Sequence, residues 1–137
     1  KKKKNIFMEQ YLNAMSGKNY ANFKGRSRRQ EFWMFNLFYF LISVICIIID
    51  VQIFEFSIDD QFAPLYTICS LIHLIPSLAV TVRRYHDVGY SGHFISTAIL
   101  LTFVFLIGPI WAFVICVSDG KVADNKWGSN PKLIDKD

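Results

Sequence analysis

Three long stretches without a charged side chain are the feature that most limits how this chain can fold. Residues 32–49, 63–82 and 94–117 contain no Asp, Glu, Lys or Arg. The eighteen residues of the first stretch would make about 27 Å of helix, which approaches the roughly 30 Å hydrocarbon core of a bilayer. The chain is 53% hydrophobic and 19% charged, which is more apolar than an ordinary soluble domain. The sequence therefore predicts an all-α integral membrane protein with a single domain over residues 1–137.

The three stretches predict three transmembrane helices. Pro76 removes a backbone donor inside the second stretch, a defect that membrane helices tolerate where a neighbour satisfies the freed carbonyl. The third stretch has twenty-four residues, or about 36 Å of helix, and this length favours one tilted span kinked at Pro109. The alternative is four transmembrane helices, with the third stretch folded as a hairpin of two half-helices that turns at Gly108 and Pro109.

A short amphipathic helix is predicted before the first span. Phe7, Tyr11 and Met15 recur at helical spacing among polar residues. Such a helix is too short to be stable alone in water, so we expect it on the membrane surface or against a neighbouring helix. Ser27 and Gln30 have the spacing of a capping box, which predicts that the first long helix starts at Arg28. No cleavable signal peptide is expected, because polar sequence follows the basic start.

A polar stretch at residues 82–93 is predicted to form a membrane loop. Arg83 and Arg84 would close the second apolar helix, where cations suit the negative end of the helix dipole. Gly89 and Gly92 would supply the backbone freedom for the reversal that follows.

The distribution of charge predicts the orientation. Nine of the fifteen Lys and Arg residues precede the first span, whereas residues 50–62 carry four acidic residues and no basic one. Because cytoplasmic segments carry an excess of Lys and Arg, the N-terminus and residues 82–93 are predicted to be cytoplasmic. Residues 118–137 contain equal numbers of Lys and Asp residues and are predicted to form a polar extension with an interfacial Trp127. Their side depends on the number of spans, outside for three and inside for four.

Three polar motifs stand in order along the chain. They are Phe-x-Gly-Arg-x-x-Arg-x-Glu-Phe-Trp at residues 23–33, Arg-Arg-x-His-Asp-x-Gly-x-Ser-Gly at residues 83–92 and Asp-Asn-Lys-Trp-Gly-Ser-Asn-Pro at residues 124–131. Together they resemble a family of small bacterial inner-membrane proteins, domain of unknown function 805 (DUF805), over about residues 11–131. The chain departs from the family pattern at Tyr85, at His93 and at the pair Lys126 and Trp127. The resemblance implies a multi-pass protein of the bacterial inner membrane, and it implies no activity.

The polar side chains at the membrane boundaries are the candidate functional residues. Asp87 is close in sequence to two arginines and shares its predicted membrane face with a second arginine cluster, so charge-assisted hydrogen bonds are expected. These residues are predicted to form a cytoplasmic polar network: Arg26, Arg28, Arg29, Glu31, Arg83, Arg84, His86 and Asp87.

Enzymatic chemistry is not expected. Metal-dependent phosphohydrolases use a His-Asp pair such as His86 and Asp87, but they need several further ligands, and His73 and His93 are the remaining histidines. We therefore expect no catalytic residues, no metal and no cofactor. The three cysteines lie inside apolar runs without a C-x-x-C pair and are expected to be small buried hydrophobes.

Two functional hypotheses follow. The first is a non-enzymatic membrane module that binds anionic phospholipid headgroups, another membrane protein or a second copy of itself through its basic cytoplasmic face. Nucleic acid is not an expected partner, because the cations flank apolar runs and do not cover a soluble body. The alternative is a small oligomeric transporter or channel that uses His73 and the Pro76 kink, since an ionisable group inside a membrane is a functional candidate. Otherwise His73 is a neutral histidine bonded across a helix interface.

The orientation can be tested by cysteine accessibility in a variant that lacks the native cysteines. We expect Ile58→Cys to react with an impermeant maleimide added outside the cell, and Tyr90→Cys to react only when the reagent reaches the cytoplasm. The reverse pattern would overturn the orientation.

Overall fold

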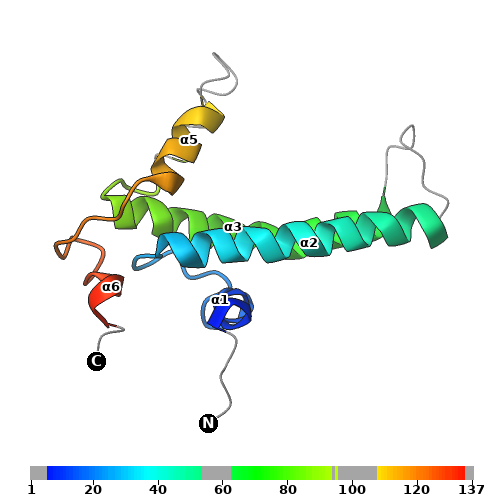
Figure 1. Ribbon diagram of the computed structural model, residues 1–137, viewed down its shortest axis with the longest axis horizontal. Helices are drawn as coiled ribbons and strands as arrows, with labels where there is room; N and C mark the ends of the chain where they lie inside the picture. The colour runs from blue at the N-terminus through cyan, green and yellow to red at the C-terminus, as the bar shows by residue number, and fades with distance from the viewer. Residues whose placement is uncertain (1–5, 54–62, 94, 96–107, 135–137) are drawn as a thin grey trace, which may run out of the picture.

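Two long antiparallel helices, α2 and α3, lie side by side along the long axis of the molecule (Figure 1). The computed structural model describes residues 6–53, 63–93, 95 and 108–134. The helices of these residues are α1 (Ile6–Met15), α2 (Arg29–Ile53), α3 (Pro64–Val88), α5 (Gly108–Val117) and α6 (Pro131–Ile134). Within the described ranges there is no strand, and one isolated bridge joins Asn125 to Gly128. The predicted all-α class is confirmed for this part of the chain.

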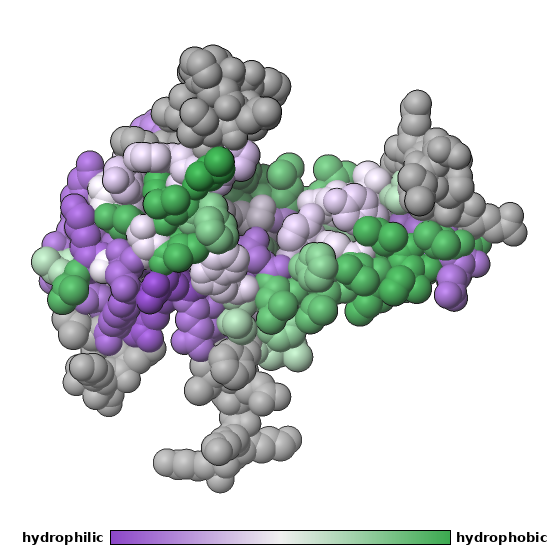
Figure 2. Space-filling view, turned by 45° about the horizontal axis from the view of Figure 1, so that its top comes forward, coloured by the Kyte–Doolittle hydropathy of each residue, from purple (hydrophilic) through white to green (hydrophobic). Residues whose placement is uncertain are grey.

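By length and composition, α2 and α3 are candidate membrane spans. Each has 25 residues, or about 37 Å of helix, and their outward faces are apolar, with Phe40 and Leu71 each 62% exposed. Apolar surface covers much of the pair in Figure 2, whereas hydrophilic residues gather at one end. We call this end, where residues 25–31, 83–93 and 118–130 lie, the polar end. The opposite end of the pair is the far end.

At the far end, a buried carboxylate joins the two long helices. Asp50 accepts hydrogen bonds from the backbone N–H groups of Leu65 (3.0 Å) and Tyr66 (2.9 Å) in the first turn of α3. A carboxylate is favourable there, because the N–H groups of a first turn lack helical partners and carry the positive end of the dipole. The sequence had placed Asp50 in the connection after a span ending at residue 49, but α2 continues to Ile53. The rest of that connection, residues 54–62, lies outside the described residues.

The predicted loop at residues 82–93 is wrong in its first half. Helix α3 continues through this stretch to Val88 and ends at Gly89, whose φ of 100° is left-handed. The N–H of Gly89 bonds to the carbonyls of Tyr85 and His86, and the N–H of Tyr90 bonds to Tyr85 O. The helical pattern is hidden in the sequence because residues 83–87 are all buried, so this part of the helix has no exposed polar face.

The predicted amphipathic helix is confirmed as α1, which Figure 1 shows end-on across the α2–α3 pair. Ala14 is 1% exposed and packs in one cluster with Phe35 of α2 and Val80 of α3. Met8 and Leu12 lie on the outward side and are 46% and 57% exposed. Helix α1 therefore has one face against the long helices and one apolar face directed outward.

The ends of the third apolar run lie at the polar end. Ile95 packs against the cluster formed by Tyr85, Ile115 and Cys116, although a single helix over residues 94–117 would separate Ile95 from Ile115 by about 30 Å. This contact does not fit one straight helix over the whole run, and the number of spans that the run forms stays a prediction. Helix α5 begins at Gly108, where the alternative placed its turn. Residues 94 and 96–107, which make up the first half of this run, lie outside the described residues.

Candidate functional site

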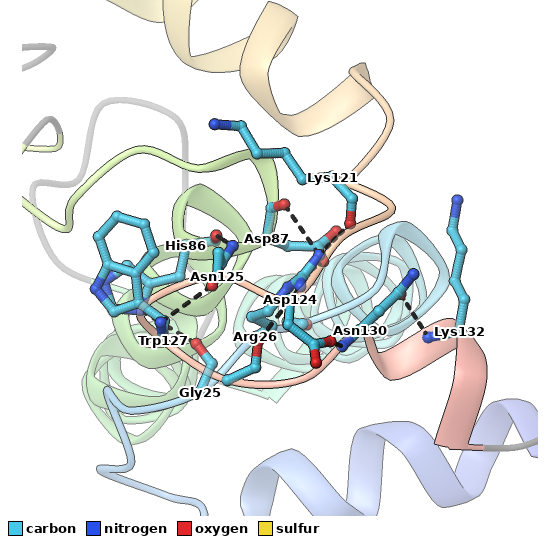
Figure 3. Close-up of polar contacts among 12 residues, drawn as sticks. Gly25, Arg26, His86, Asp87, Lys121, Asp124, Asn125, Trp127, Asn130 and Lys132 are labelled. Atoms are coloured by element: carbon cyan, nitrogen blue, oxygen red, sulfur yellow. Dashed lines mark hydrogen bonds and ion pairs between the residues drawn. The ribbon is translucent and has the colours of Figure 1, made fainter.

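The carboxylate of Asp87 lies between two buried guanidinium groups at the polar end. Figure 3 shows Asp87 with one of them, Arg26. Arg26 Nε donates to Asp87 Oδ1 at 3.0 Å, and Arg84 Nη1 donates to Oδ2. The exposed fractions of the three side chains are 1% for Arg26, 4% for Asp87 and 0% for Arg84. Charge-assisted bonds of this kind are roughly twice as strong as neutral ones, and here they join two segments 61 residues apart.

Arg84 also binds the C-terminal end of α5. Its Nε donates to Cys116 O (3.3 Å), one terminal nitrogen donates to Ser118 O, and the other reaches Ser27 O (3.4 Å). Burial lowers the pKa of Arg84, and Asp87 acts in the opposite direction. The carbonyls at a helix C-terminus carry partial negative charge, which suits a cation. Arg84 therefore connects the end of α5 to the residues that precede α2.

Arg26 attaches the tail to the same centre. Its guanidinium donates to the carbonyls of Lys121 and Ala123, the latter at 3.0 Å. The backbone N–H of Lys121 returns a bond of 2.9 Å to Asp87 O. A Cβ atom at Gly120 would overlap the Asp87 carboxylate, so the tail can approach only because residue 120 has no side chain.

His86 forms the other contact with the tail. Its Nδ1 lies 3.1 Å from Gly25 O, its backbone carbonyl accepts a bond from Asn125 Nδ2 (2.9 Å), and its ring stacks on Trp127 at 4.6 Å. Burial lowers the pKa of His86; the Gly25 carbonyl opposes this effect and Lys126 adds to it. The imidazole is therefore neutral at pH 7. Because a carbonyl can only accept, we assign the proton to Nδ1.

The tail has its own internal bonds. Asn130 is buried; its Nδ2 donates to Val122 O (2.7 Å) and its N–H to Asp124 Oδ1 (2.9 Å). Asn130 Oδ1 also accepts the N–H of Lys132 at the start of α6. The tail is a largely exposed extension, as predicted, but Trp127 is half-buried against His86. An interfacial position of Trp127 stays a prediction.

The remaining predicted residues occupy the same end in different ways. Arg83 pairs with Glu31 at 3.0 Å, and its carbonyl accepts the N–H of Ser27. Arg29 pairs with Asp119 at 2.9 Å at the edge of the site, where its side chain is 44% exposed. Arg28 lies just before α2. All eight predicted residues thus lie at the polar end, and the structure selects Arg26 and Arg84 as the partners of Asp87.

The predicted capping box is not formed. Helix α2 begins at Arg29, and Ser27 Oγ has no hydrogen-bond partner in the part of the chain that the structure describes. A backbone hydrogen bond from the N–H of Ser27 to the carbonyl of Arg83, and not a capping box, fixes the chain where it enters α2.

His73 lies apart from this network, 14 residues before Asp87 or about 21 Å along α3. Its Nδ1 donates to Cys69 O (2.8 Å), its Nε2 accepts from the hydroxyl of Tyr11 (2.7 Å), and its ring stacks on Tyr39. This is the geometry of a histidine bonded across a helix interface.

The pairing of Asp87 with two arginines limits the chemistry that its carboxylate can perform. Both oxygens of Asp87 are engaged by guanidinium groups, so the carboxylate is poorly placed to act as a base or a metal ligand. In the described ranges, no group of three His, Cys, Asp or Glu residues could hold a metal ion. The absence of enzymatic activity stays a prediction.

The sequence reasoning missed the tail residues Gly120, Asn125, Trp127 and Asn130. The third motif, residues 124–131, contains Asn125, Trp127 and Asn130 and is the signal for these three residues, whereas Gly120 lies outside it. All three motifs in fact meet at the polar end: Arg26 and Gly25 come from the first, His86 and Asp87 from the second, and Asn125 and Trp127 from the third.

Comparison with known proteins agrees with these motifs. The family described as "Protein of unknown function (DUF805)" matches residues 20–129. "Inner membrane protein YhaI" of Escherichia coli strain K12 is 32% identical over 126 residues, which cover 92% of this chain and 98% of the relative. "Inner membrane protein YhaH" of the same strain is 31% identical over the same shares of the two chains. No solved structure matches the chain.

We expect Asp87→Asn to lower the free energy of unfolding by about 3 kcal/mol or more, the usual effect of breaking a buried ion pair from one side. The substitution leaves two buried guanidinium groups without a counter-charge. Thermal unfolding in detergent measures the loss.

A matched pair of alanine substitutions tests whether the contact between the tail and Asp87 contributes to the stability of the protein. Gly120→Ala should also lower the melting temperature, because its methyl group displaces the Asp87 carboxylate, whereas a Cβ at Gly17 meets nothing within 4 Å and Gly17→Ala should be tolerated. Equal melting temperatures for the two alanine variants would contradict the docked position of the tail.

Proposed function

The chain belongs to the DUF805 family, and from that premise we propose that it is an inner-membrane protein whose polar end forms a cationic cytoplasmic platform for anionic phospholipid headgroups. The relatives reported above are named inner membrane proteins. The observation that carries the proposal is the uneven distribution of charge along the α2–α3 pair. Hydrophilic residues gather at the end where the apolar surface stops (Figure 2), and that end is rich in Lys and Arg.

The position of α1 supports a boundary of the hydrocarbon region at the level of Phe35 and Val80. Helix α1 packs against Phe35 and Val80. From Phe35 to the end of α2 is 18 residues, and from the start of α3 to Val80 is 16 residues, which correspond to about 27 Å and 24 Å of helix. A bilayer core of about 30 Å fits this part of the pair. Helix α1 then lies at the membrane surface, and the Asp87 network projects beyond the hydrocarbon.

The charge asymmetry supports a cytoplasmic polar end. Residues 16–31, 83–93 and 118–134 contain ten Lys and Arg residues and four Asp and Glu residues. In contrast, Asp50 is the one charged residue among residues 36–53 and 63–82. This excess of cations supports a cytoplasmic position for the polar end, and with it for the N-terminus.

The same argument supports a cytoplasmic tail. Arg84 and Arg29 hold the end of α5 at the polar end, and Arg26 holds the tail there. The third apolar run then crosses the membrane an even number of times, or enters and leaves it on one face. Three full spans would place the tail outside, so the four-helix alternative fits better.

The exposed cations are the proposed headgroup contacts. The arginines of the network already have partners inside the protein, whereas Lys18, Lys24 and Lys126 are exposed and make no ion pair with a described residue. A Lys or Arg near an anionic membrane surface contributes about 1 kcal/mol to binding. Binding of headgroups therefore depends on these lysines, while the network keeps their supporting segments in place.

No specific observation favours the transport alternative. Both ring nitrogens of His73 lie within hydrogen-bonding distance of other groups of the protein, Tyr11 and Cys69. The ring is therefore engaged within the helix interface.

The position of the tail can be tested with Ser129→Cys in a variant that lacks the native cysteines, because Ser129 is exposed. An impermeant maleimide should label this cysteine only from the cytoplasmic side. Labelling from outside intact cells would contradict a cytoplasmic tail and would favour three spans.

Headgroup binding can be tested with a triple variant, Lys18→Gln, Lys24→Gln and Lys126→Gln, in neutral detergent. Short-chain phosphatidylglycerol should raise the melting temperature of the unmodified protein, and the variant should lose most of this shift, because about 3 kcal/mol of favourable charge interaction is removed. The corresponding Lys→Arg variant is the control and should keep the shift, and phosphatidylcholine should shift neither. Equal shifts of the melting temperature for the Gln and Arg variants would contradict the proposal.

A further inference from the structure

A proline in the middle of α3 leaves one backbone carbonyl without its helical partner. In an α-helix each N–H bonds to the carbonyl four residues earlier. Pro76 has no N–H, so the carbonyl of Ile72 cannot be satisfied within the helix. The hydroxyl of Tyr20 donates to this carbonyl at 2.6 Å. A side chain from the N-terminal segment therefore replaces the backbone bond that Pro76 removes.

A second tyrosine of the same segment binds the next residue of α3. The hydroxyl of Tyr11 bonds to the ring of His73 at 2.7 Å, and the Tyr11 ring stacks on Phe35 and lies beside Phe38 of α2. Two tyrosines nine positions apart in the sequence thus reach adjacent residues of α3, directly before Pro76.

The turn that follows α1 is built to present Tyr20. The N–H groups of Asn19 and Tyr20 both bond to Ser16 O, at 2.9 Å and 2.7 Å. Asn19 Nδ2 donates to Asn13 Oδ1 at 2.8 Å, which ties the turn back to α1. Helix α1 and this turn therefore form one unit that positions both phenolic hydroxyls.

Helix α3 is fixed to α2 on either side of the proline. At the far end Asp50 accepts the first N–H groups of α3, and at the polar end Arg83 pairs with Glu31. A proline inside a helix is a usual site of bending. Pro76 lies between these two attachments, at the level where the N-terminal segment crosses.

We propose that residues 6–20 form a strap that closes over the proline break of α3, held by the hydroxyls of Tyr11 and Tyr20. Release of the strap exposes the carbonyl of Ile72 and the ring of His73 and lets α3 bend at Pro76. The outward face of α1, with Met8 and Leu12 exposed, is an apolar surface for the bilayer.

The test is a double-mutant cycle with tryptic cleavage after Lys18, which lies in the strap and is exposed. Tyr20→Phe removes one neutral hydrogen bond and should raise the cleavage rate of the full chain in detergent about five-fold. Pro76→Ala restores an N–H at position 76 that can satisfy Ile72 O. In the Pro76→Ala background, Tyr20→Phe should therefore change the cleavage rate by less than roughly two-fold.

Tyr11→Phe is the matched control, because its hydroxyl binds the His73 ring and not the freed carbonyl. It should raise the cleavage rate by a similar factor in both backgrounds. Pro76→Leu also restores the N–H and serves as a second background if Pro76→Ala does not fold. An equal effect of Tyr20→Phe with and without Pro76, or no effect in the unmodified protein, would overturn the strap.

Discussion

The buried carboxylate of Asp87 is the interaction on which the polar end depends. A carboxylate away from water is costly unless it is paired and hydrogen-bonded, and Asp87 has both kinds of compensation from Arg26 and Arg84. The two guanidinium groups carry one positive charge in excess of the carboxylate. Their other donors bond to backbone carbonyls of the tail and of the end of α5. Satisfying one buried charge thus brings together segments from the whole length of the chain.

The cations of the polar end divide by residue type. The network uses arginine, whose planar guanidinium offers five donors in a fixed fork and can bind several carbonyls together with a carboxylate. Apart from Arg29, the exposed cations of this end are lysines, whose single ammonium group is a point charge on a flexible stem. The arginines of the network thus have a structural role, which needs directional bonds inside the protein. The exposed lysines have the proposed binding role, which needs charge at the surface.

Helix α3 connects these features along the axis of the molecule. Its first turn is bound by Asp50 of α2, its last two turns carry the Asp87 network, and Pro76 lies between them. The carbonyl that the proline frees is satisfied by Tyr20 from a segment more than fifty residues earlier. The stability of the helix at this point is therefore a property of the tertiary structure, since no local bond can replace it.

The sequence by itself determined the membrane class, the presence of α1, α2 and α3, and which stretches carry the charged side chains at the ends of the apolar runs. Runs of apolar residues and charges at their boundaries are local signals. The tertiary structure alone decided that Asp87 pairs with Arg26 and Arg84 while Arg83 pairs with Glu31, since adjacent arginines look alike in sequence. It also decided that residues 83–88 are helical, because side chains buried all round leave no periodic pattern. The docking of the tail depends on the bonds of Arg26 to the carbonyls of Lys121 and Ala123, which bring distant parts of the chain together and leave no trace in local composition.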